Sequence, residues 1–209
     1  PPSAPRAPGL APEIAKATED FTGRGWALAA LDQWLADGGS RVFLFTGGPG
    51  TGKTALAARL AQISAGEVSA PPGARLEPGC LSFCYFCQAR SDVLLHPLRF
   101  IEALSGFLAR RHPRVAEALV KLRDRDISVS LNVGVMATGA RAAALEIKSL
   151  QVGGLSARTA FDRLVRRPLQ WLYTADHGEP IVILIDALDE AWAFDPEENL
   201  VTLLRDALD

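Results

Sequence analysis

The sequence predicts an α/β protein with three layers, in which helices cover both faces of a mainly parallel sheet and an antiparallel hairpin is inserted. Apolar runs at residues 41–45 and 181–185 are each long enough for a buried parallel strand. A helical pattern follows the first run at residues 55–61. Residues 127–135 alternate apolar and polar without error, which predicts a strand with one face in water.

The composition predicts a globular chain with a full core. Of 209 residues, 48% are hydrophobic, and the net charge of −2 argues against a protein that binds nucleic acid through bulk positive charge. No apolar run approaches the ~20 residues of a membrane span. The three cysteines lie close together at positions 80, 84 and 87, which favours a reducing, cytoplasmic setting and core packing over disulfides or a zinc site.

The remaining elements follow in order along the chain. Residues 1–19 are rich in proline and predict a linker or tail, and residues 20–209 are expected to form one domain. The pattern predicts a helix over about 26–36 with Trp26 on its apolar face, and a second buried strand over 80–87. Beyond these, we expect helices at 97–111 and 115–122, the hairpin at 126–152, a helix capped by Ser156 and interrupted at Pro168, and a last helix over 197–208.

A glycine-rich loop joins the first strand to its helix, with Gly47, Gly52, Lys53 and Thr54 at the spacing G-x-x-x-x-G-K-T. Glycine permits the backbone conformations that aim consecutive N–H groups at a phosphate, and the helix start adds a partial positive charge. Lys53 is the expected charge for the β- and γ-phosphates, and the Thr54 hydroxyl is the expected Mg²⁺ ligand. The expected nucleotide contacts are Gly47, Gly48, Pro49, Gly50, Thr51, Gly52, Lys53, Thr54 and Ala55.

An acidic motif follows the second apolar run. Asp186 ends that run, and ligands in open α/β sheets lie beyond the carboxyl ends of the strands, so we expect Asp186 at the same edge as Lys53. A carboxylate there can hold Mg²⁺ directly or through a water molecule. Asp189 or Glu190 is expected to orient the water that attacks the γ-phosphate.

These motifs resemble the P-loop NTPases of the STAND class, and within it the NACHT domains. The resemblance rests on the loop at 47–54, on the D-x-x-D-E pattern at 186–190 and on the lead-in at 21–24, and it covers roughly residues 20–66 and 180–192. It implies that the backbone of the lead-in lines the adenine pocket, through Phe21, Thr22, Gly23 and Arg24.

The resemblance also implies a function. STAND proteins are switches that ADP holds closed, whereas ATP and a signal sensed elsewhere in the parent chain favour an open homo-oligomer that activates an effector. Bacterial members act in signalling and in defence against phage, and slow ATP hydrolysis resets the switch. The implied cofactors are ATP or ADP with Mg²⁺, and the implied partners are sensor and effector domains.

The sequence departs from the STAND pattern after Glu190, where the class has a sensor strand and a helical lid. We therefore expect a fragment of a longer protein, or another segment in that place, and weak nucleotide binding by this chain alone. Two alternatives stay open: a P-loop kinase that phosphorylates a small molecule, and a binding module without turnover. The absence of the N/T-K-x-D pattern favours adenine over guanine.

Overall fold

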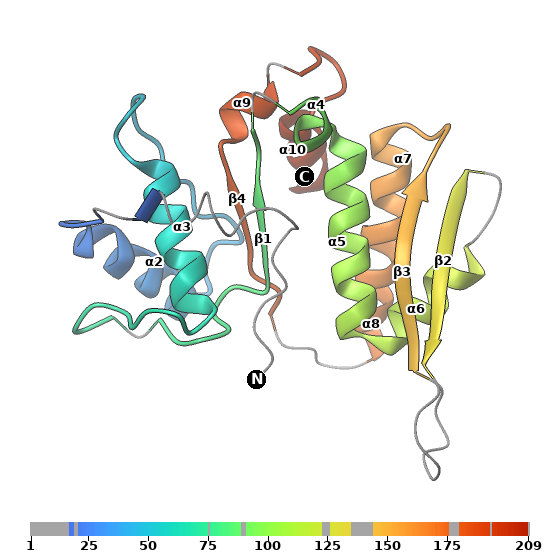
Figure 1. Ribbon diagram of the computed structural model, residues 1–209, viewed down its shortest axis with the longest axis horizontal. Helices are drawn as coiled ribbons and strands as arrows, with labels where there is room; N and C mark the ends of the chain where they lie inside the picture. Colours follow the sequence, from blue (N-terminus) through green and yellow to red (C-terminus); the bar gives the residue numbers. More distant parts are fainter. Residues whose placement is uncertain are drawn as a thin grey trace, which may run out of the picture. The chain divides into compact units, whose positions relative to one another are not determined.

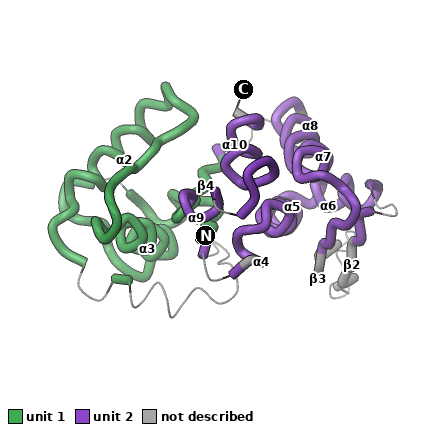
Figure 2. The backbone as a smooth tube through the Cα atoms, turned by 90° about the horizontal axis from the view of Figure 1, so that it is seen from above, with its two compact units in different colours: residues 1–86, 181–187 green, residues 87–180, 188–209 purple. Residues whose placement is uncertain are grey.

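The computed structural model describes residues 17–18, 21–74, 76–88, 91–122, 126–134, 144–175, 180–192 and 194–208. The chain divides into two compact units, coloured separately in Figure 2. Unit 1 comprises residues 1–86 and 181–187, and unit 2 comprises residues 87–180 and 188–209. The predicted linker over 1–19 lies almost wholly outside the described residues.

Two helices of unit 1 confirm the prediction from the sequence. Helix α2 (Gly25–Asp37) ends at Gly38, whose left-handed backbone donates its N–H to the Trp34 carbonyl. Helix α3 (Lys53–Ser64) follows the glycine loop. The predicted apolar face of α2 is wrong at Trp26, which is 67% exposed, because Ala27, Leu28 and Leu31 form the buried side.

The sheet of unit 1 is a parallel pair. Strands β1 (Phe83–Phe86) and β4 (Ile183–Asp186) pair in register, and the Ser82 N–H extends the ladder to the Val182 carbonyl at 2.8 Å. All four β1 residues are buried, as predicted. The first three residues of β4 are only half-buried, because β1 is the one neighbouring strand among the described residues.

The predicted strand at residues 41–45 is not present, since residues 42–48 have no regular secondary structure. A strand needs a neighbouring backbone to bond with, and here the Val42 N–H and carbonyl bond to the hydroxyl of Ser40. Alternate side chains of the segment face helix α2, where the rings of Phe43 and Phe45 contact those of Trp34 and Trp26 in tilted pairs. Leu44 is 74% exposed. The segment therefore packs against α2 through these two rings without entering the sheet.

The core of unit 1 lies between α2, α3 and the sheet. Helix α3 contributes most to this core, because seven of its twelve residues are buried. Phe43, Phe45 and Leu184 pack against the same cluster. The buried residues of this core include Leu28, Leu31, Leu56, Ala58, Leu60, Ile63, Leu81, Cys84 and Phe86.

Unit 2 is built around helix α5 (Pro97–Arg111), nine of whose fifteen residues are buried. The helices that accompany it, drawn in Figure 1, are α4 (Asp92–Leu95), α6 (Pro113–Lys121), α7 (Ala157–Phe161), α8 (Arg167–Ala175), α9 (Leu188–Trp192) and α10 (Leu200–Leu208). The last predicted helix thus begins three residues later than expected. Its first residue follows a cap in which the Thr202 N–H donates to the Asn199 side-chain oxygen at 2.9 Å.

The predicted antiparallel pairing is confirmed. Strands β2 (Ile127–Gly134) and β3 (Ala144–Val152) pair with an irregularity between Ser130 and Leu131, and the connecting residues 135–143 lie outside the described residues. Strand β3 packs on helices α5 and α6. The pair thereby obtains the packing that an isolated hairpin lacks.

The helix expected after Ser156 is continuous across Pro168. The Ser156 side chain caps it as predicted, by accepting from the Thr159 N–H. A π-helical turn, η1 (Asp162–Arg166), stands between α7 and α8, and the Arg167 N–H bonds back to the Asp162 carbonyl. The wider turn accommodates Pro168, which has no N–H and would clash in a regular α-helix.

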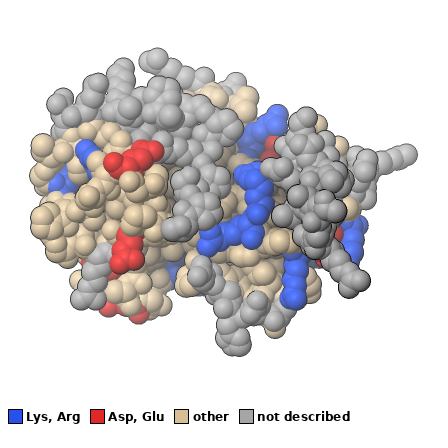
Figure 3. Space-filling model, turned by 60° about the horizontal axis from the view of Figure 1, so that its bottom comes forward, with Lys and Arg blue, Asp and Glu red and all other residues tan. Residues whose placement is uncertain are grey.

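The described residues thus form a mixed α/β protein with a parallel and an antiparallel strand pair. Within those residues, no helix is long and apolar enough to cross a membrane. Side chains of both charges are exposed on the face in Figure 3. The small net charge therefore reflects a balance of 22 cations against 24 anions and not a shortage of charged residues.

Candidate functional site

The glycine loop of unit 1 is a tight turn. The Thr51 N–H and hydroxyl both donate to the Gly48 carbonyl, at 3.4 and 2.8 Å. Gly50 and Gly52 have φ angles of 73° and 74°, in the left-handed region that side chains disfavour. A Cβ atom on Gly47 would lie 2.8 Å from the Thr51 hydroxyl oxygen. Three of the predicted glycines are thus required by the shape of the loop itself.

Lys53 is the first residue of α3, and its side chain folds back over the loop. Its ammonium group donates to the carbonyls of Gly47 and Gly48, at 2.8 and 3.1 Å. The first backbone N–H groups of a helix have no acceptor within the helix, and this end carries about half a positive charge. The loop therefore combines a mobile cation with a helix start, a donor set that fits the oxygens of a polyphosphate.

The two predicted metal ligands lie on elements that pack together. Thr54 is exposed in the first turn of α3, and Asp186 is the buried last residue of β4. Helix α3 packs on β4, and Figure 1 shows α3 beginning and β4 ending at the same end of unit 1. One hydroxyl and one carboxylate suit Mg²⁺, which keeps several waters and takes few protein ligands when it binds with phosphates.

Asp186 is followed by an unusual backbone conformation. Ala187 has a φ of 55°, and it is the one residue other than glycine with a positive φ in the described part of the chain. The left-handed conformation turns the chain sharply at the end of β4. Strained residues of this kind occur preferentially at functional sites, where neighbouring structure holds them.

The lead-in segment reaches the glycine loop through a contact that the sequence did not predict. Phe21 packs partly against the core of unit 1, and the guanidinium groups of Arg24 and Arg59 lie 5.9 and 4.9 Å from the centre of its ring. The Arg24 guanidinium also donates a hydrogen bond to the Gly52 carbonyl. No local pattern signals this contact, because it joins residues 28 positions apart.

The other lead-in residues and the remaining loop residues lie mostly at the surface. Thr22 and Gly23 are exposed, as are Pro49 and Gly50, and Ala55 is half-buried. The structure thus brings together the loop, Lys53 and Arg24.

The predicted catalytic acids lie in the other unit. Asp189 and Glu190 are in the first turn of α9, which belongs to unit 2, whereas Lys53 belongs to unit 1. Asp189 is exposed and Glu190 is half-buried. Their proposed part in positioning water stays a prediction from the sequence.

The cysteines occupy the core position that was expected of them. Cys84 and Cys87 are buried, and burial raises the pKa of the Cys80 thiol despite a hydrogen bond with Ser64. Groups of three or more His, Cys, Asp or Glu residues that could bind a metal are not found within the described ranges.

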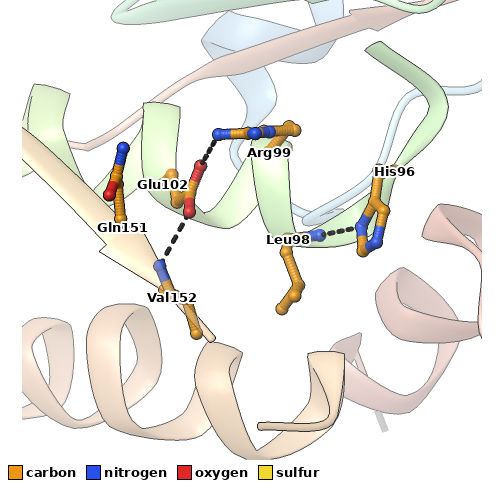
Figure 4. Close-up of a pocket in the computed structure, with 6 residues that line it drawn as sticks. All are labelled: His96, Leu98, Arg99, Glu102, Gln151 and Val152. Atoms are coloured by element: carbon orange, nitrogen blue, oxygen red, sulfur yellow. Dashed lines mark hydrogen bonds and ion pairs between the residues drawn. The ribbon is translucent and has the colours of Figure 1, made fainter. Parts of the chain in front are cut away.

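Unit 2 has a separate polar hollow of about 310 Å³, lined by His96, Leu98, Arg99, Glu102, Gln151 and Val152 (Figure 4). Three of the polar side chains that line it, those of His96, Arg99 and Glu102, form hydrogen bonds. The Glu102 carboxylate accepts from the Arg99 guanidinium at 2.9 Å and from the Val152 N–H at 2.8 Å, and the His96 ring accepts from the Leu98 N–H at 3.2 Å. The bond between Glu102 and Val152 links the start of α5 to the end of β3.

Comparison with known proteins identifies a family. A family model described as the AAA ATPase domain matches residues 20–209. Searches of curated proteins and of solved structures returned no match.

Proposed function

Because the chain belongs to the AAA ATPase domain family, whose members are P-loop NTPases that bind nucleotide, we propose that it is the nucleotide-binding part of a STAND-type switch. The observation that carries nucleotide binding is the glycine loop, with the Lys53 ammonium folded over it at the start of α3. The D-x-x-D-E pattern at 186–190 supports the finer NACHT-like assignment.

In the proposed site, separate sets of residues bind the phosphates, the adenine and the magnesium ion. The loop at 47–55 and Lys53 bind the phosphates, and residues 21–24 line the adenine pocket. Thr54 and Asp186 hold Mg²⁺, which spreads the negative charge of the phosphates when it is bound. Asp189 or Glu190 orients the attacking water, which makes the chain a slow ATPase.

The proposed switch depends on the γ-phosphate. A ligand shifts an equilibrium only by its difference in affinity for the two states, and the γ-phosphate with Mg²⁺ adds contacts in one of them. ATP then favours a homo-oligomer that activates an effector, in signalling or in defence against phage, and ADP favours the closed monomer.

Calorimetric titration with MgATP and MgADP tests the site. Lys53→Ala should weaken ATP binding by about 10–100-fold, because a hydrogen bond to a charged group contributes about 1.5–3 kcal/mol. Lys121→Ala is the matched control, since Lys121 is exposed in α6 of unit 2. Equal ATP affinity of the wild type and Lys53→Ala would show that the loop is not the site.

Two further measurements separate this function from its alternatives. Phosphate release from ATP without an acceptor supports the switch, whereas release that requires an added acceptor supports a small-molecule kinase. Binding without any release supports a module without turnover. Light scattering after chromatography in MgATP and in MgADP tests the proposed oligomer, and an identical molar mass in both would contradict it.

A further inference from the structure

We infer that the Arg24 side chain is a second cation of the phosphate site, held in place by the Gly52 carbonyl. This inference rests on the proposed function. The role proposed above for residues 21–24 is that their backbone lines the adenine pocket. The inference adds a separate role for the side chain of Arg24, which binds the phosphates.

The backbone of Arg24 is fixed by the start of α2. Its carbonyl accepts from the N–H groups of Ala27 and Leu28, at 3.1 and 3.3 Å. From there its guanidinium reaches Gly52, the residue that caps α3, and donates to a carbonyl that also accepts from the Leu56 N–H at 3.0 Å. A Cβ atom on Gly52 would overlap the guanidinium, so the group lies directly against the backbone of the loop.

Positive charge lies next to this guanidinium. The start of α3 carries about half a positive charge, and Lys53 is the next residue after Gly52. In the part of the chain that the structure describes, Arg24 forms no ion pair with a carboxylate. The ring of Phe21, 5.9 Å away, is its one compensating aromatic contact. A polyphosphate at the loop would neutralise both cations.

Arginine also has the donors for this task. A guanidinium has five N–H groups in a planar fork that matches phosphate oxygens, and the bond to Gly52 uses one of them. An ammonium group can replace the charge but not the fork. Arg24→Lys should therefore recover only part of the function.

Arg59 provides a matched control within the same unit. Its guanidinium also lies over the Phe21 ring, 4.9 Å from the ring centre. It donates to the Thr18 carbonyl at 3.3 Å and not to the loop. Loss of Arg59 should disturb Phe21 and leave the phosphates unaffected.

The experiment measures the affinity of the full chain for inorganic tripolyphosphate and for ATP, both with Mg²⁺, by calorimetry. Variants Arg24→Gln, Arg24→Lys and Arg59→Gln are compared with the wild type after circular dichroism has established that each is folded. We expect Arg24→Gln to weaken both ligands by about 10-fold or more, Arg24→Lys to weaken them less, and Arg59→Gln to stay within about 2-fold. The loss should shrink at high salt, because added ions screen charge.

Four other results would each contradict the inference, and each would point to a different explanation. Wild-type affinity for tripolyphosphate in Arg24→Gln would remove Arg24 from the phosphate site and leave the proposed function standing. Weaker ATP binding with unchanged tripolyphosphate binding would assign Arg24 to adenine. Equal losses in the Arg24 and Arg59 variants would mean that both act structurally through Phe21. A wild type that binds neither ligand would overturn the proposed function together with the inference.

Discussion

Replacing Gly50 and Gly52 by alanine, one at a time, tests how the glycine loop is held. The two residues have nearly the same φ, 73° and 74°. An alanine in the left-handed region costs about 1–2 kcal/mol, and the stiffer unfolded chain returns about 0.4–1 kcal/mol. Gly50→Ala should therefore lower the free energy of unfolding by about 1 kcal/mol, since its new Cβ would have open space around it.

Gly52→Ala carries an additional loss. Its Cβ would overlap the Arg24 guanidinium, which must then leave the Gly52 carbonyl. A hydrogen bond from a charged donor contributes about 1.5–3 kcal/mol when buried, and this one is partly exposed, so about 1 kcal/mol is expected. The total for Gly52→Ala is then about 2 kcal/mol, twice that of Gly50→Ala.

Urea denaturation followed by tryptophan fluorescence measures both changes. Trp26 and Trp34 belong to unit 1, so a background with Trp171→Phe and Trp192→Phe confines the signal to the unit that holds the loop. Adding Arg24→Gln to the background should make the two glycine variants equal, because the displaced contact is then already lost. Equal destabilisation by the two variants with Arg24 intact would refute the reasoning.

Three further predictions concern single groups. Glu102→Ala removes the acceptor of the Val152 N–H and should lower the free energy of unfolding in urea by about 1–3 kcal/mol. Ala187→Gly should raise that free energy by up to about 1 kcal/mol, because it relieves the left-handed backbone. Burial, and then the charge of Arg111, lowers the pKa of His112 from its usual 6.5. The unfolded chain therefore binds a proton that the folded chain does not, and stability should fall as the pH drops from 6.5 through the folded pKa.

The controls for these predictions use neighbouring groups. Arg99→Ala should lower the unfolding free energy by less than about 1 kcal/mol, because its side chain is 52% exposed, and a larger loss than in Glu102→Ala would contradict the assignment. Ala65→Gly, at a φ of −77°, should destabilise and not stabilise. A His112→Gln variant that keeps the same pH dependence of stability would show that another group is responsible.

Local patterns in the sequence determined much of what the site is made of. The spacing of Gly47, Lys53 and Thr54 predicted a loop that leads into a helix, and the structure has α3 beginning at Lys53. The alternation over residues 127–134 predicted β2, and the apolar run before Asp186 predicted β4. These signals are readable because each depends on residues within about one turn or one strand of one another.

Tertiary structure decided the features that depend on distant partners. Residues 41–45 have the composition of a buried strand, yet strand formation requires a second backbone, and the neighbours of this segment are the aromatic side chains of α2. The burial of β4 also depends on distant partners. Its first three residues are only half-buried, because it has a single neighbouring strand in the described residues. The contact of Arg24 with Gly52 joins two helix starts that only folding brings together, so no periodicity could reveal it. A sequence specifies the hydrogen-bonding groups of each segment, whereas their partners are set by the packing of the whole unit.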